Sequence, residues 1–451
     1  MNKSKLRIGY VPLAKKSWLN DKLETVRKDA LKMLQKTGVE TVSTEGLITD
    51  RSQADELAAF FIKGNIDCLL FHHITFSLGS IVPAMIKKVD VPVIFWSMPE
   101  PPMEGGRISS NSFCASNMNA HTLWKMGRKY AYVYGNDKEA ENEMESQFKS
   151  LQCVKSLKST RIGLLGNRVP GFYTSNYNEL KMMETFGIEV EHVDLLELVA
   201  MARNADSDLP AAVNEIKRMS RINANVSETE IEQEARLYSA FKVIREKYNL
   251  DACAVKCWPE LPEFYGIAPC SAMGMLSGNG IICGCEGDIY GTMTMIVQNL
   301  LTGAPPFFCD LISLDYKENE AIAWHCGAAS PSLKADNQNY ALCKHSVVDG
   351  GDKKGVTGEF PLKPGRVTLA RFSEDRNGGY RLFLAGGQAV ETGRLIKGNP
   401  VKIKFDAPLK DITDTIIENG FEHHYSLVYA DIGKELLNIC KWLDVKMFNF
   451  S

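Results

Sequence analysis

The chain has 451 residues, of which 45% are hydrophobic and 24% charged, and its formal net charge at pH 7 is −3. This length allows two or three globular domains with substantial cores. The small net charge, without a basic stripe of interleaved aromatic residues, argues against a nucleic-acid partner. No apolar run approaches 18 residues, so we expect no membrane span. The first residues lack the apolar centre of a secretion signal, and we expect a cytoplasmic protein whose 12 cysteines are reduced thiols.

Strands and helices alternate through the first part of the chain. Short apolar runs separated by amphipathic segments predict a parallel sheet with helices on both faces. The expected strands are Leu6–Val11, Asp67–Phe71, Val91–Trp96 and Arg128–Tyr134, and the expected helices are Asp21–Lys36, Ser52–Lys63, Ile81–Lys88 and Lys138–Leu151.

A second strand-led unit begins after the polar segment KSLKST. We expect strands at Arg161–Leu165, in GIEVEHVDL and at Asp251–Lys256, with a short helix at Leu180–Phe186. The long helix Ser227–Tyr248 opens with the capping box S-E-T-E. The segment CWPELPEFYGIAPC contains three prolines and predicts a loop.

The pattern changes after about residue 328. GRVTLARFS, YRLFLAGGQAVE and NPVKIKF alternate apolar and polar residues between glycine turns, which predicts antiparallel strands, and Ile432–Leu443 returns to helical periodicity. The sequence therefore predicts an α/β protein. Two Rossmann-like α/β domains with parallel sheets, residues 1–157 and 158–327, precede a β-rich, barrel-like C-terminal domain, residues 328–451.

Five cysteines cluster between residues 253 and 285, in the segments CAVKC, PC and CGC. No pair among them has the CxxC spacing that is common in structural zinc and iron–sulfur sites. We interpret them as small buried hydrophobic residues.

Two acidic residues stand at equivalent places in residues 280–310. Ile281–Cys285 and Phe307–Cys309 are apolar runs that flank a helical segment, and Glu286 and Asp310 follow these runs directly. A strand–helix–strand unit of this length predicts two parallel strands and places both acids at one edge of one sheet. Neighbouring carboxylates repel, and a divalent cation between them relieves the repulsion. The alternative is that each acid only caps a helix or forms a turn.

Three of the eight histidines lie downstream, where they could complete a metal site. His325 follows an apolar run, and His423 and His424 form an adjacent pair. A hydrogen-bonded core histidine is the alternative for each. Two carboxylates with one or two imidazoles suit Mn²⁺, with Mg²⁺, Co²⁺ or Fe²⁺ as alternatives.

Four motifs together resemble the L-fucose isomerase/L-arabinose isomerase superfamily of aldose–ketose isomerases. CEGDIYG, with FFCD ending 24 residues after its glutamate, resembles the two metal-carboxylate motifs of the family. WHCGAAS resembles the segment that carries a histidine ligand in the arabinose isomerases, and EHHYSLVYAD resembles the segment with the terminal histidine ligand. The resemblance extends over most of the chain and implies the three-part fold described above.

The resemblance implies that Glu286, Asp310 and His424 bind the metal. His325 is a further candidate ligand, although the fucose-type enzymes use three protein ligands. An aldose becomes a ketose when a proton moves between C1 and C2, and a bound cation can polarise the carbonyl. We hypothesise that Glu286 and Asp310 also form the acid/base pair. A hydride shift is the alternative route.

Several residues are candidates for contact with the sugar, each with an ordinary structural role as the alternative. Trp258 could stack on a sugar face, and an arginine could neutralise an anionic substrate group. In the resembling enzymes the first domain supplies a pocket residue to a neighbouring subunit. The candidates are Asn117, His121, Trp258, Glu260, Arg107, Arg168 and His423.

The resemblance leaves the sugar open among L-fucose, D-arabinose, L-arabinose and a sulfonated hexose such as sulfoquinovose. It also implies a homohexamer with active sites between subunits. Two other functions are compatible with two α/β domains: a sugar-binding protein without catalysis, and a metal-dependent aldolase that cleaves the carbon chain.

Overall fold

The computed structural model describes residues 5–205, 209–345 and 354–451. The chain divides into two compact units, Asn2–Lys155 and Ser156–Ser451. Within the described ranges, no helix is both long enough and apolar enough to cross a membrane.

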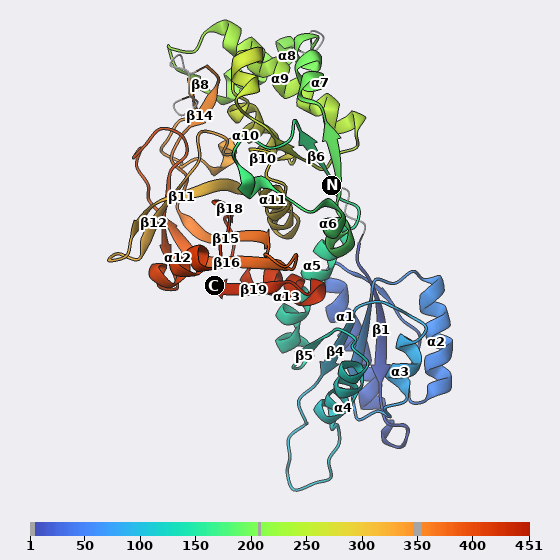
Figure 1. Cartoon of the computed structure of the whole chain (residues 1–451). Helices are drawn as coiled ribbons and strands as arrows, with labels where there is room; N and C mark the ends of the chain where they lie inside the picture. The colour runs from blue at the N-terminus through green and yellow to red at the C-terminus, as the bar shows by residue number, and fades with distance from the viewer. Residues whose placement is uncertain (1–4, 206–208, 346–353) are drawn as a thin grey trace. The chain divides into compact units, whose positions relative to one another are not determined.

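The N-terminal unit is built on a five-stranded parallel sheet with the strand order β2-β1-β3-β4-β5. Every residue of β3 and β4 is buried, as expected for central strands covered on both faces. The predicted parallel α/β architecture is confirmed here (Figure 1). The strands are β1 (Arg7–Leu13), β2 (Glu40–Val42), β3 (Cys68–His73), β4 (Val93–Ser97) and β5 (Tyr130–Tyr134), and the helices are α1 (Asp21–Lys36), α2 (Arg51–Lys63), α3 (Ile81–Ile86), α4 (Ser112–Lys125) and α5 (Asp137–Leu157).

The second unit begins with another parallel sheet, of strand order β10-β9-β6-β7. Ser227 caps α9 with the reciprocal bonds of the predicted capping box. The elements of this part are β6 (Arg161–Leu165), α6 (Glu179–Phe186), β7 (Glu189–Val193), α7 (Leu195–Arg203), α8 (Leu209–Met219), β8 (Arg221–Ile222), α9 (Glu228–Lys247), β9 (Ala252–Val255), α10 (Cys270–Gly278), β10 (Ile282–Cys285) and α11 (Ile289–Thr302).

The same unit contains a closed barrel of six antiparallel strands. The ring runs β15-β18-β11-β12-β17-β16 and closes because β15 also pairs with β16. The predicted barrel-like C-terminal part is confirmed (Figure 1). The barrel and the elements around it are β11 (Phe307–Asp315), β12 (Glu320–Trp324), β13 (Ala341–Cys343), β14 (Thr357–Glu359), β15 (Gly365–Glu374), β16 (Tyr380–Val390), β17 (Val401–Phe405), α12 (Leu409–Glu418), β18 (His424–Val428), α13 (Gly433–Leu443) and β19 (Lys446–Phe450), which adds to β16 in parallel.

One expectation about residues 280–310 is wrong. β10 and β11 do not share a sheet, because β10 pairs with β9 in the parallel sheet whereas β11 pairs with β12 and β18 in the barrel. The helix between them, α11, packs against both layers, and 11 of its 14 residues are buried (Figure 1). A helix buried on nearly every side must be covered by two layers, and these are the parallel sheet and the barrel.

The prolines of residues 257–270 do not prevent all helical structure. Leu261–Tyr265 forms one short helical turn, and α10 begins at Cys270. The sequence patterns also missed α7 and α8, which precede the capping box of α9.

Candidate active site

The turn between β10 and α11 presents Glu286. Glu286 and Gly287 have backbone φ angles of +60° and +68°, and Asp288 then caps α11 through the N–H of Gly291. A Cβ at Gly287 would lie 2.5 Å from the carbonyl oxygen of Asn167, so only glycine fits there. A glutamate in the left-handed region is uncommon, and such conformations concentrate at functional sites.

A buried ion-pair network fixes the orientation of His424. Arg371, on β15, donates hydrogen bonds to both carboxylate oxygens of Asp288, at 2.6 and 3.1 Å. The Nδ1 of His424, the first residue of β18, lies 3.0 Å from Asp288 Oδ2. That contact holds a proton on Nδ1 and fixes the orientation of the ring. The Nε2 atom, on the far side of the ring from Asp288, is then left as the nitrogen that can accept a proton or bind a cation.

Two carboxylates meet this Nε2 atom from different elements. Glu286 Oε2 lies 3.3 Å from His424 Nε2, and Asp310 Oδ1, on β11, lies 3.9 Å from it. His423 Nε2 is 3.6 Å from the same Glu286 oxygen. The Trp258 indole N–H donates to the other glutamate oxygen at 3.0 Å. The two acids are therefore neighbours across two sheets, rather than along one sheet edge.

The charges of this network are strongly coupled. Burial raises the pKa of Glu286, but the imidazoles of His423 and His424 outweigh burial and hold this pKa below its usual range. Burial also raises the pKa of Asp288, but Arg371 and His424 together outweigh burial and hold this pKa below its usual range. Burial lowers the pKa of His424, yet its two carboxylate neighbours raise the pKa to about 9. The carboxyl groups of Glu286 and Asp288 are thus ionised at neutral pH. Beside them, His424 Nε2 needs either a proton or a cation.

The donor set fits a hard divalent cation. Glu286 Oε2 and Asp310 Oδ1 are buried and accept no hydrogen bond. Glu286, His423 and His424 each offer a ligand atom within 4.8 Å of the others. Buried carboxylate oxygens without donors are stabilised by a metal ion, and oxygen with imidazole ligands suits Mn²⁺.

Two cavities open onto these residues. One, of about 250 Å³, is lined by Trp258, Glu286, Asp310 and His325, and the other, of about 620 Å³, contains Glu286, Asp310 and His424. Both also include Phe172. A ligand in this space would touch both carboxylates.

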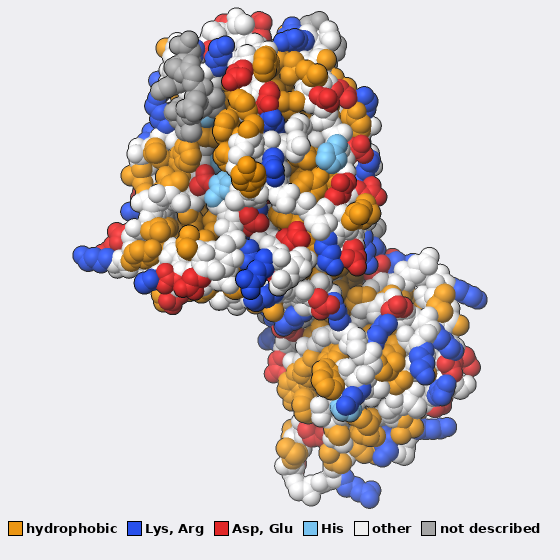
Figure 2. Space-filling model, in the orientation of Figure 1, with side chains coloured by type: hydrophobic (Ala, Val, Ile, Leu, Met, Phe, Trp, Pro, Cys, Tyr) orange, Lys and Arg blue, Asp and Glu red, His pale blue; other side chains and the backbone are white. Residues whose placement is uncertain are grey.

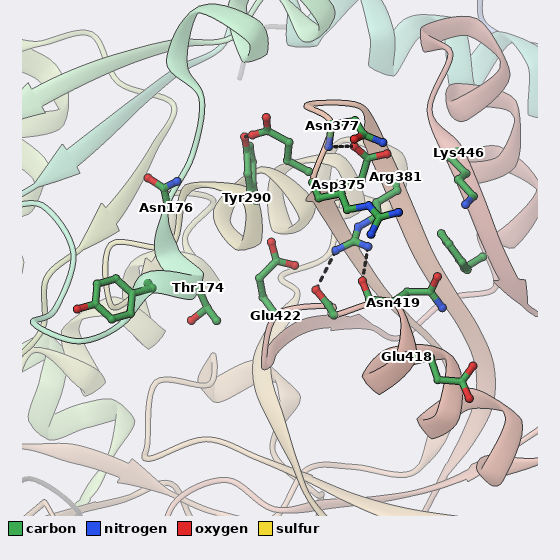
Figure 3. A pocket seen from close by; sticks show the side chains of 15 residues that line it. Thr174, Asn176, Tyr290, Asp375, Asn377, Arg381, Glu418, Asn419, Glu422 and Lys446 are labelled. Carbon is green, nitrogen blue, oxygen red and sulfur yellow. Dashed lines mark hydrogen bonds between the residues drawn. The ribbon is translucent and has the colours of Figure 1, made fainter.

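A larger cavity of about 760 Å³ has a different lining. Figure 3 shows Tyr290, Glu422 and Arg381 pointing toward it, with Arg381 bonded to the carbonyl oxygens of Asn419 and Gly420. Glu422 lies 3.5 Å from the Nε of Arg371, the residue that holds Asp288. This cavity is larger, but it lacks the converging carboxylates and imidazoles. We therefore take the two smaller cavities that contain Glu286 and Asp310 as the candidate active site.

The other predicted site residues have varied surroundings. His325 is buried, with its Nδ1 3.4 Å from Cys326 Sγ and its ring centroid 6.3 Å from that of His424. The ring of Phe172 contacts both Trp258 and His423 edge-on. Glu260 forms an ion pair with Lys256.

Four arginine and polar candidates are less closely tied to the carboxylates. The guanidinium of Arg168 lies over the Tyr173 ring, at 5.2 Å, and its Cα adjoins Gly287. Arg107 is exposed in a loop of the N-terminal unit, and Asn117 and His121 are exposed on α4 of that unit. The sequence patterns missed Asp288 and Arg371, although a capping position inside CEGD was a usable signal for the first.

Known proteins match this chain over 96–98% of its length. Residues 324–451 match the L-fucose isomerase C-terminal domain, and residues 9–158 match the fucose/sulfoquinovose isomerase N-terminal domain. Sulfoquinovose isomerase of Alkalicoccus urumqiensis is 32% identical over 441 residues, covering 96% of this chain and 97% of that protein. The proteins of the same name from Priestia megaterium and a Clostridium species are 29% and 24% identical, at coverages of 97% and 98% of both chains.

The fold and this full-length similarity define an aldose–ketose isomerase. The chain belongs to the fucose/sulfoquinovose isomerase family. Among solved structures, a periplasmic solute-binding protein from Actinobacillus succinogenes with bound D-allose aligns at a TM-score of 0.18 and 11% identity, over 66% of this chain and 92% of that one. A score this low is no sign of a shared fold.

Proposed function

We propose that the protein is a metal-dependent isomerase that interconverts sulfoquinovose and its ketose. Glu286, Asp310 and His424 would hold the cation, with Mn²⁺ the preferred ion and Mg²⁺ or Co²⁺ the alternatives. One observation carries this proposal: two carboxylate oxygens without hydrogen-bond donors converge on one imidazole nitrogen. His325 and His423 are the candidates for a further contact with the ion or the sugar.

The same two acids are suited to proton transfer. A cation held by Glu286, Asp310 and His424 would supply positive charge that polarises the sugar carbonyl and makes the proton on the adjacent carbon easier to remove. Glu286 and Asp310 come from different elements, the turn before α11 and strand β11 respectively. One can remove the proton from C2 and a proton is returned to C1, while the hydroxyl proton of O2 is lost and O1 gains one, so that the carbonyl moves from C1 to C2. Trp258 keeps Glu286 oriented through its hydrogen bond. The side chains of Phe172 and Trp258 give the sugar an aromatic wall.

The sulfonated substrate is supported by the names of the relatives and by one nearby arginine. All four relatives are named sulfoquinovose isomerase. A sulfonate needs a cationic partner, and Arg168 adjoins the turn that presents Glu286. We therefore assign Arg168 as the candidate for the anionic end of the sugar, ahead of Arg107. L-Fucose, D-arabinose and L-arabinose are the substrates to be compared with it.

We further propose a homo-oligomer, a hexamer by family resemblance, whose subunits share active sites. Phe113, Asn117, His121 and Trp124 lie three or four residues apart and so share one face of α4. Phe113 and Trp124 are 57% and 66% exposed, and Figure 2 shows hydrophobic side chains gathered over α4 and β5. An apolar helix face that also carries a histidine suits docking onto a second subunit.

The decisive experiment is an aldose panel that includes sulfoquinovose, assayed for ketose formation after chelation and after return of Mn²⁺. We expect sulfoquinovose turnover that the chelator abolishes and Mn²⁺ restores. Glu286→Gln should lower kcat by about 10²–10⁴-fold, the usual contribution of a general acid or base. Chelator-resistant turnover would contradict the metal requirement, and full turnover of Glu286→Gln would contradict its role. Solvent deuterium at C1 or C2 of the product separates proton transfer from a hydride shift.

A further inference from the structure

A second group of metal-ligating side chains lines the same space as the two carboxylates. This thiol cluster consists of Cys270, Cys326 and His345, all of which line the cavity of about 250 Å³. Cys270 is the first residue of α10, Cys326 follows β12, and His345 follows β13. The two cysteines are 56 residues apart in the sequence, so no local spacing announces the cluster.

The two sulfur atoms of the thiol cluster are separated by the distance expected at tetrahedral zinc, with an imidazole close by. The ligand atoms of Cys270, Cys326 and His345 all lie within 4.8 Å of one another. Cys270 Sγ and Cys326 Sγ are 3.8 Å apart. With Zn–S bonds of about 2.3 Å, the edge between two sulfur ligands of a tetrahedron is about 3.8 Å. The thiols are thus already spaced as ligands of one ion.

The surroundings provide stabilisation and an open coordination position. Cys270 and His345 are buried, and Cys270 is the first residue of α10. His325 Nδ1 lies 3.4 Å from Cys326 Sγ, so a second imidazole adjoins the cluster. Three protein ligands with a fourth position facing a cavity is the pattern of zinc sites that exchange ligands.

We propose that the thiol cluster is a second metal site, which takes a soft divalent ion such as Zn²⁺. Ligand chemistry separates it from the site of Glu286, Asp310 and His424, because thiolates favour zinc whereas carboxylates favour manganese or magnesium. The cavity would therefore hold a hard ion on one wall and a soft ion on the other. This inference stands on its own and does not need the proposed substrate or the proposed role of Mn²⁺.

Cobalt titration of the full chain tests the site. Co²⁺ bound by thiolates gives a sulfur-to-metal charge-transfer band in the near ultraviolet, whereas Co²⁺ on carboxylates and imidazoles gives none. With Mn²⁺ in excess to fill the carboxylate site, we expect added Co²⁺ to produce the band and added Zn²⁺ to abolish it. Cys270→Ser and Cys326→Ser should each remove most of the band, and His345→Gln should weaken affinity on the order of 10–100-fold or more while keeping both thiols.

Two controls keep the result specific. Cys257→Ser removes another thiol of the same cavity, whose Sγ lies 2.9 Å from that of Cys285, and it should leave the band unchanged. Glu286→Gln, which changes only the carboxylate site, should also leave the band unchanged. Absence of a band in the folded wild-type chain, or a band that follows Cys257 instead of Cys270 and Cys326, would overturn the inference.

Discussion

In the proposed site, Asp288 would be a positioning residue that acts through His424. Its carboxylate is held by Arg371 on one side and by the Nδ1 of His424 on the other, and all three side chains are buried. A carboxylate behind a metal-binding imidazole fixes the tautomer and orientation of the ring. Arg371 in turn keeps the carboxylate ionised, so the network works as one unit.

Asp288→Asn tests that role. The amide keeps the shape of the side chain but removes the charge that balances Arg371 and His424. We expect metal affinity and kcat/KM to fall on the order of 10–100-fold, the usual effect of losing such a partner. Metal titration and steady-state kinetics measure the two quantities. Asp414→Asn, which affects an exposed ion pair on α12, is the control and should change neither. Unchanged metal affinity in Asp288→Asn would contradict the positioning role.

The turn before α11 depends on its backbone conformation. Gly287→Ala introduces a Cβ against the carbonyl oxygen of Asn167 at a φ of +68°, so the turn that presents Glu286 must shift. We expect a large loss of kcat together with destabilisation of about 1–3 kcal/mol. Gly303→Ala is a matched control, because its φ is +71° but open space surrounds it. That variant should lose about 1 kcal/mol of stability and keep its kcat. Equal losses of kcat in both variants would contradict the argument.

A buried acid on α9 makes stability depend on pH. Burial raises the pKa of Glu234 to about 8, although Ser271 donates a hydrogen bond to it. The folded state therefore keeps a proton that the unfolded chain, with an ordinary pKa of about 4.3, releases. Between these two pKa values the free energy of unfolding falls as pH rises.

Glu234→Gln should remove this slope. We expect urea denaturation midpoints of the wild type to be lower at pH 8 than at pH 6, and the difference to shrink in the variant. Glu232→Gln, an exposed acid on the same helix, should behave as the wild type. A variant with the full wild-type slope would show that Glu234 is not the responsible group.

Local sequence patterns predicted the elements better than their partners. Hydrophobic alternation and the capping box located most strands and α9, because these features depend on neighbouring residues. β11 pairs with β18, which lies more than 100 residues later in the sequence, and local hydrophobic periodicity cannot predict such a distant pairing. Glu286, Asp310 and His424 were named from motifs, whereas Arg371 lies 83 residues from Asp288 and reads as one more charged residue in a strand.

At the scale of the molecule, the exposed face of α4 is the feature with a testable consequence. Phe113→Asp combined with Trp124→Asp places two charges on this face. We expect a smaller assembly by light scattering and, where subunits share sites, a loss of kcat with little change in secondary structure. Leu180→Asp, an exposed apolar residue on α6 in the other unit, should leave the assembly intact. An unchanged mass in the double variant would place the interface elsewhere.

The late position of β18 has a consequence for synthesis. β18 pairs with both β11 and β15, and it brings His424 to acids that left the ribosome more than 100 residues earlier. Until β18 emerges, the edges of β11 and β15 stay unpaired and the two carboxylates lack their imidazole. A chain stalled before this strand would therefore expose two unpaired strand edges, and the proposed site would lack one of its three ligands until the same five residues emerge.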